Sequence, residues 1–152
     1  MLRKESAFAS VAPLVSDGDR PRDWRGIGRM NIETALKEAM SIEGATGVAL
    51  VDWDSGMPLG TLGGGKYLDL DLAAAGNTEV VRAKMRTMQS LNLNDSIEDI
   101  LITLNQQYHL IRLLRNADGS HNLFLYLVLD RSKANLALAR HHLRRIETEL
   151  DI

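Results

Sequence analysis

The sequence contains no cysteine, which excludes a disulfide framework, a cysteine nucleophile and any metal site built on thiolates. It has no apolar run near the roughly 20 residues that a membrane-spanning helix needs, and no hydrophobic segment typical of a secretory signal. Basic residues are not in excess, because the net charge is −2 and the isoelectric point is near 6.1. Nucleic-acid binders usually have an isoelectric point above about 9. These absences predict a cytoplasmic protein that neither binds nucleic acid nor inserts into a membrane.

What is present is typical of a folded domain with a polar tail. The chain of 152 residues is 45% hydrophobic and 25% charged, as in ordinary globular proteins. The first 29 residues differ, because they hold two of the three prolines and the polar stretch SDGDRPR at 16–22. Such a stretch buries too little apolar area to offset the entropy of ordering it. We expect 1–29 to be an N-terminal extension, largely disordered, and 30–152 to form one domain.

Hydrophobic periodicity after Met30 predicts eight elements in the order α-β-β-α-β-β-β-α. Helices are expected over about 32–42 and 68–91, and a third begins after Ser132 as its N-cap. The expected strands are 46–53, 57–62, 97–104, 108–115 and 122–129. This order predicts an α+β fold in which a five-stranded antiparallel sheet carries helices on its faces.

Two of the strands differ in a way that predicts their places in the sheet. The stretch LFLYLVL at 123–129 is apolar at every position, so both of its faces should be covered, as in a central strand. The strand 97–104 carries Glu98 and Asp99 at neighbouring positions, which point to opposite faces of a sheet. Charges of this kind are typical of an edge strand.

Few residues form a pattern that supports chemistry. Gly60-x-x-x-x-Gly65-Lys66 matches the first seven positions of a phosphate-binding loop, but Tyr67 stands where Ser or Thr would hold magnesium. Glycines at a connection between strand and helix explain the match equally. His141 and His142 are adjacent and cannot share a metal on one helix face, and no histidine lies in a nucleophile context. We therefore expect no catalytic, cofactor-binding or metal-binding residues, with nucleotide binding at Gly60–Lys66 as a remote option.

The long middle helix carries two apolar stripes. The first should cover the sheet and consists of Leu70, Ala74, Val81, Met85 and Met88. The second consists of Leu72, Val80, Lys84 and Leu91. The second stripe suits either a partner protein or a wide buried face within the same chain.

The order of elements and several short stretches resemble the roadblock/dynein-light-chain family. The resemblance covers about 31–150, and its residues include GATGVALVD at 44–52 and DSGMPL at 54–59. Further matches are ILIT at 100–103, YHLIR at 108–112 and the apolar strand before the last helix. Members start with a helix that ends in glycine, a strand, and a D-x-G turn into the second strand.

The resemblance implies a non-enzymatic, profilin-like domain that homodimerises by joining sheets at the third strand and packing the middle helices. Its bacterial members resemble regulators of small Ras-like GTPases, encoded beside sensor kinases. By position, the dimer interface would include Ile97, Asp99 and Leu101 on the edge strand, and Val80, Val81, Lys84 and Met88 on the helix. We expect a homodimer that scaffolds or regulates a small Ras-like GTPase, with a sensor kinase as a further candidate partner. The alternative is a profilin- or PAS-like module that senses a small molecule between sheet and helix.

Overall fold

The computed structural model describes residues 30–115 and 122–151. The predicted extension 1–29, the residues 116–121 between two of the predicted strands, and residue 152 lie outside the described residues. The helices are α2 (Ile32–Met40), α3 (Leu70–Ser90) and α4 (Leu136–Glu149). The strands are β1 (Ala45–Asp52), β2 (Met57–Gly63), β3 (Asp99–Thr103), β4 (Gln107–Leu114) and β5 (Leu123–Asp130). The predicted order of elements is confirmed.

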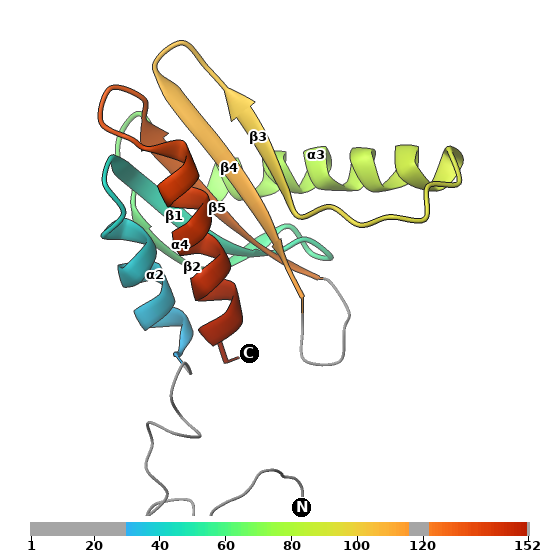
Figure 1. The fold of residues 1–152 in the computed structure, drawn as a ribbon, viewed down its shortest axis with the longest axis horizontal. Coiled ribbons are helices and arrows are strands. Elements are labelled where there is room, and N and C mark those ends of the chain that lie inside the picture. The colour runs from blue at the N-terminus through green and yellow to red at the C-terminus, as the bar shows by residue number, and fades with distance from the viewer. Residues whose placement is uncertain (1–29, 116–121, 152) are drawn as a thin grey trace, which may run out of the picture.

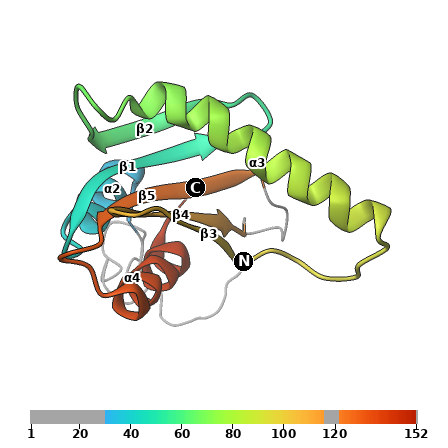
Figure 2. The ribbon, with the colours of Figure 1, turned by 90° about the horizontal axis from the view of Figure 1, so that it is seen from above.

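The strands form one antiparallel sheet in the order β2-β1-β5-β4-β3. Figure 2 shows α3 on one face of this sheet and α2 with α4 on the other. The α+β class and the five-stranded sheet with helices on its faces are thereby confirmed. No helix in the described parts of the chain is long and apolar enough to cross a membrane.

Strand β5 lies in the middle of the sheet and is buried along almost its whole length. Its leucines 123, 125, 127 and 129 join the core beneath α2 and α4, whereas Phe124, Tyr126 and Val128 join the core beneath α3. Because side chains alternate between the faces of a strand, an all-apolar sequence is what a strand covered on both sides requires. The predicted central place of this strand is confirmed.

The helix ends follow local side-chain chemistry, with one correction. The Asn31 side chain accepts a hydrogen bond from the Thr34 backbone N–H at 2.8 Å, as an N-cap does. The last helix begins at Leu136 and its N-cap is Asn135, so the prediction that Ser132 caps it was wrong. Ser132 instead donates its hydroxyl (2.7 Å) and its backbone N–H (2.9 Å) to the Asp130 carboxylate in a preceding turn.

Helix α2 packs closely on β2 because Gly60 has no side chain. A Cβ placed at Gly60 would lie 2.9 Å from Leu36 Cδ1 and 3.3 Å from Ile32 Cγ2. The β1–β2 turn likewise depends on Gly56, whose φ of +80° is a conformation that other residues rarely adopt. These two positions explain the glycine at the turn and one end of the Gly60–Gly65 pattern.

Two ion pairs connect the edge strand β3 and its neighbour β4 to α4. Arg112 on β4 contacts one Glu147 oxygen at 2.8 and 3.0 Å, and the other oxygen accepts from the Arg115 backbone N–H at 3.0 Å. Asp99 on β3 accepts two hydrogen bonds from Arg140 at 3.0 and 3.2 Å. The Arg112 and Glu147 side chains are only 10% and 18% exposed, so little water would replace a lost partner. These contacts hold the open side of the sheet to α4.

Replacing Arg112 by Met should lower the free energy of unfolding by about 3 kcal/mol, because it leaves a mostly buried carboxylate without its counter-ion. Urea denaturation measures this change. The matched control is Arg145→Met, which removes a pair to Glu38 at 3.2 Å whose side chains are 46% and 40% exposed. That pair should contribute less than about 1 kcal/mol. An equal decrease in the free energy of unfolding in the two variants would show that the Arg112–Glu147 pair stabilises the fold no more than the exposed pair does.

Candidate interaction surface

The best candidate for a functional surface is the open side of the sheet at β3, together with the exposed flank of α3. Within the described residues β3 pairs with β4 alone, so one row of its backbone N–H and C=O groups has no strand beside it. The five residues of β3 contain no proline or glycine, and its pairing with β4 is regular. Such an edge is a ready template for another strand.

The side chains of β3 alternate between two environments. Ile100 pairs across the strands with Ile111 and packs on the core beneath α3. Leu101 pairs with Leu110 and packs on the core beneath α4. Ile100 and Ile102 therefore share the α3 side of the sheet, and both are only partly buried. Sequence reasoning omitted Ile102, although the period of two along the strand contains this signal.

Helix α3 leaves the α3 side of β3 partly uncovered. It packs over β1 and β2, and its C-terminal turns extend past the sheet in both views (Figures 1 and 2). Val80 and Lys84, four residues apart, lie together on an exposed flank of α3, and Val80 is 37% exposed. Leu91 at the end of the helix is 61% exposed. The second apolar stripe is thus exposed on the surface of this chain and is not part of its core. Its residues are Leu72, Val80, Lys84 and Leu91.

The seven residues expected at a dimer interface differ in how exposed they are within the chain. Val80 and Lys84 are exposed, and Ile97 is partly buried against the core beneath α3. Val81 has no exposed surface and Met88 is 9% exposed, so neither is on the surface. Val81 lies in the core beneath α3 of its own chain, and the place of both residues at a dimer interface stays a prediction.

The Asp99 and Leu101 side chains make contacts within their own chain on the α4 side, and their place at a dimer interface stays a prediction. The Asp99 carboxylate is engaged by Arg140, and Leu101 packs on the core beneath α4. A partner that pairs with β3 would contact the backbone of these residues more than their side chains. Their side chains hold the edge strand in place from the α4 side.

A chain of polar side chains lies on the α3 side of the sheet beside this surface. The Tyr126 hydroxyl lies 2.9 Å from His109 Nδ1, and His109 Nε2 lies 2.8 Å from Gln107 Oε1. Tyr126 also forms a side-chain hydrogen bond with Asn77 of α3. Burial lowers the pKa of His109 and raises the pKa of Tyr126, so both groups stay neutral near pH 7. No pattern in the sequence indicates this chain, because its members come from three separate elements.

This arrangement bears on the small-molecule alternative. A sensing site would need polar groups that converge on a cavity. Here His109 and Tyr126 face each other and find partners in Gln107 and Asn77. They explain a specific packing between helix and sheet without a ligand.

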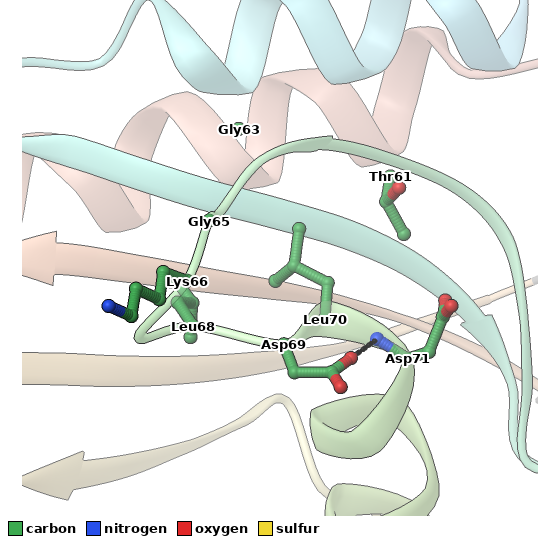
Figure 3. A pocket seen from close by; sticks show the side chains of 8 residues that line it. All are labelled: Thr61, Gly63, Gly65, Lys66, Leu68, Asp69, Leu70 and Asp71. Atoms are coloured by element: carbon green, nitrogen blue, oxygen red, sulfur yellow. Dashed lines mark hydrogen bonds between the residues drawn. The ribbon is translucent and has the colours of Figure 1, made fainter.

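The loop that resembles a phosphate-binding loop has a different structure. Gly60 lies inside β2, and α3 begins only at Leu70, four residues after Lys66. The helix N-terminus is occupied by its own cap, because Asp69 Oδ1 accepts from the backbone N–H groups of Asp71 and Leu72 at 3.1 Å. Figure 3 shows Asp69 and Asp71 lining the hollow of about 320 Å³ beside this loop. Carboxylates at a helix N-terminus repel a phosphate.

Other candidate ligands are equally dispersed in the described residues. His141 and His142 have ring centroids 6.0 Å apart on α4, and no group of three or more possible metal ligands gathers within 30–115 and 122–151. Asp52 is used in the β1–β2 turn, where its carboxylate accepts from the Asp54 backbone N–H at 2.9 Å. Within the described residues, none of these candidate ligands is brought together with the others into a metal-binding group.

Solved structures share this fold, whereas no protein-family model and no curated protein sequence matches the chain. The gliding protein MglB from Thermus thermophilus has a TM-score of 0.63 at 19% identity, over 76% of this chain and 82% of that one. A Roadblock/LC7 domain from Streptomyces avermitilis has a TM-score of 0.63 at 13% identity, covering 78% and 92%. Myxococcus xanthus MglB has a TM-score of 0.60 at 18% identity, covering 75% and 83%. The expected roadblock fold is thereby confirmed.

The polar chain predicts a contribution of His109 to the pH dependence of stability. Since folding lowers the His109 pKa below 6.5, the unfolded chain binds the proton more readily. Stability from this group is therefore complete above pH 6.5 and is lost as the pH falls below it. The free energy of unfolding should fall between about pH 7.5 and about pH 5, and this fall should be smaller when His109 is replaced by Phe. Chemical denaturation at the two pH values measures it. His141→Phe, a change on the exposed face of α4, should leave that loss unaltered.

Proposed function

We propose that this chain is a non-enzymatic, cytoplasmic roadblock-type module that forms a homodimer and regulates or scaffolds a small Ras-like GTPase in a bacterial signalling system. The observation that supports the dimer is the regular, unpaired edge of β3 next to the uncovered flank of α3. An isologous dimer would join two β3 edges across a two-fold axis and bring the two α3 flanks together. Val80, Lys84, Ile100 and Ile102 would lie in that interface.

The GTPase part of the proposal rests on the resemblance to roadblock regulators. The fold shared with two MglB proteins and a Roadblock/LC7 domain supports a regulatory module of this class. A sensor kinase is the further candidate partner that the resemblance implies. In this proposal the residues that contact a GTPase lie outside the β3 edge, because that edge is occupied in the dimer.

Charged side chains on the open surface should separate dimer from monomer. Val80→Glu together with Ile102→Lys is expected to give monomers, because each charge would be desolvated in the joined interface. Multi-angle light scattering after gel filtration measures the mass. Leu138→Glu, at a 46% exposed position on α4, is the matched control and should stay dimeric. An unchanged dimer in the double variant, with native circular dichroism, would contradict the β3 interface.

Val80 and Val81 are neighbours on α3, but only Val80 is exposed. Val81 is fully buried in the core beneath α3, so Val81→Glu should unfold the chain and not simply divide a dimer. A loss of helical signal in Val81→Glu, with a normal signal in Val80→Glu, would distinguish the two effects.

GTPase binding should depend on the nucleotide. The test uses a purified Ras-like GTPase from a neighbouring gene, loaded with GDP or with a non-hydrolysable GTP analogue. Calorimetry of the full chain should show tighter binding to one form, because a regulator must bind the two states with different affinity to shift between them. Equal affinity for both forms, or binding of neither, would contradict a regulatory role while leaving the dimer intact.

A further inference from the structure

The opposite edge of the sheet carries apolar side chains that the proposed dimer does not use. On β2, Met57 is 64% exposed, Leu59 is 49% exposed and Leu62 is 37% exposed. Within the described residues β2 pairs with β1 alone, so its outer side has no strand beside it. Three large apolar side chains on one short edge strand are an exposed patch of the kind that marks an interaction site.

This edge is poorly suited to pairing with another strand. Pro58 lacks a backbone N–H, and the pairing with β1 shifts so that Leu59 has no opposite residue. Proline and a bulge are common devices that prevent sheets from joining at an edge. A partner at β2 would therefore contact side chains and charges more than the backbone.

Carboxylates stand at both ends of the edge. Asp54 is exposed in the turn that precedes β2. At the other end, Asp69 and Asp71 line one hollow with Thr61 and Gly63 of β2, and Lys66 is the single basic group there (Figure 3). At the Asp54 end the Arg82 guanidinium donates to the Asp54 backbone carbonyl, so the end at Asp69 and Asp71 is the more acidic one. The β2 edge thus combines an apolar middle with one strongly acidic end, which favours an occupant that is apolar and basic.

A segment of this composition directly precedes the described domain. Residues 20–29, RPRDWRGIGR, contain four arginines, one aspartate and the apolar side chains Trp24 and Ile27. The segment joins the domain at Met30, whose N–H donates to Glu149 O at 2.7 Å and whose C=O accepts from the Asp151 N–H at 2.8 Å.

The point of attachment lies close to β2. The chain enters at Met30 beside the end of α4 and continues directly into α2, which packs on β2, since Ile32 Cγ2 would be 3.3 Å from a Cβ at Gly60. From Met30, the six residue steps back to Trp24 span at most about 22 Å. This is about the length of the seven-residue strand β2, so Trp24 and Ile27 lie within a segment long enough to follow the edge.

We propose that residues 20–29 of the same chain bind along the β2 edge. Trp24 and Ile27 cover Met57, Leu59 and Leu62, while the arginines face Asp54, Asp69 and Asp71. In this arrangement the arm covers the exposed apolar side chains of the β2 edge. The inference does not depend on the GTPase or on the dimer.

Trypsin cleavage of the full chain tests the arm, because the Arg25–Gly26 bond is cut only when the segment leaves the surface. Mass spectrometry follows the rate at this bond alone. We expect Met57→Ser with Leu59→Ser to raise the rate about tenfold, since opening then costs less. Asp69→Asn with Asp71→Asn should raise it less and make it insensitive to salt, and asparagine preserves the helix cap. The matched control Leu138→Ser should leave the rate unchanged, and far-UV circular dichroism verifies that each variant is folded.

Three outcomes would overturn the proposal. The first is an Arg25–Gly26 rate in the unaltered chain equal to that of a synthetic peptide covering 16–30. The second is equal rates in the Met57/Leu59 variant and the Leu138→Ser control. The third is protection that disappears on dilution, which would mean that the arm binds a second copy and not its own domain.

Discussion

One helix cannot cover one face of a five-stranded sheet, and the surfaces of this molecule follow from that constraint. A helix is about 10 Å wide, whereas the outer strands of such a sheet are about 19 Å apart. Among the described residues, two helices, α2 and α4, share one face, and α3 is the one helix on the other (Figure 2). Because α3 packs over β1 and β2, the α3 side of β3 stays half-exposed at Ile100 and Ile102. A partner that bound on that side would bury this apolar surface, which α3 leaves partly exposed.

The two edge strands of the sheet, β3 and β2, differ in how well they could pair with a further strand. The β3 edge is regular and free of proline and glycine, and it is held from behind by Asp99–Arg140 and Arg112–Glu147. The β2 edge has a proline and an irregular register, and it contacts α2 so closely that Gly60 tolerates no side chain. A rigid, regular edge has little entropy left to lose when a second strand pairs with it. The geometry of the β3 edge is therefore better suited to pairing with another strand than that of the β2 edge.

The architecture could be predicted from the sequence because it depends on patterns repeated over many residues. The all-apolar β5 required cover on both faces, and the order of periodic segments allowed few topologies. The exposure of individual side chains was harder to predict, because a single residue step along a helix or strand decides it. Val80 and Val81 are neighbours, yet one is exposed and the other has no exposed surface. On β3 the choice of Asp99 and Leu101 selected the α4 side, because a shift of one residue exchanges the faces of a strand.

The polar chain from Gln107 to Asn77 was beyond sequence reasoning for a different reason. Its bonds join β4, β5 and α3, and no periodicity relates residues so far apart in the chain. Once formed, it constrains how α3 lies on the sheet, because sliding the helix would leave half-buried polar atoms without partners. An apolar layer alone would permit several helix positions of similar energy. The chain therefore fixes the angle at which α3 leaves the sheet, and with it the shape of the surface that the edge strand and the helix offer to a partner.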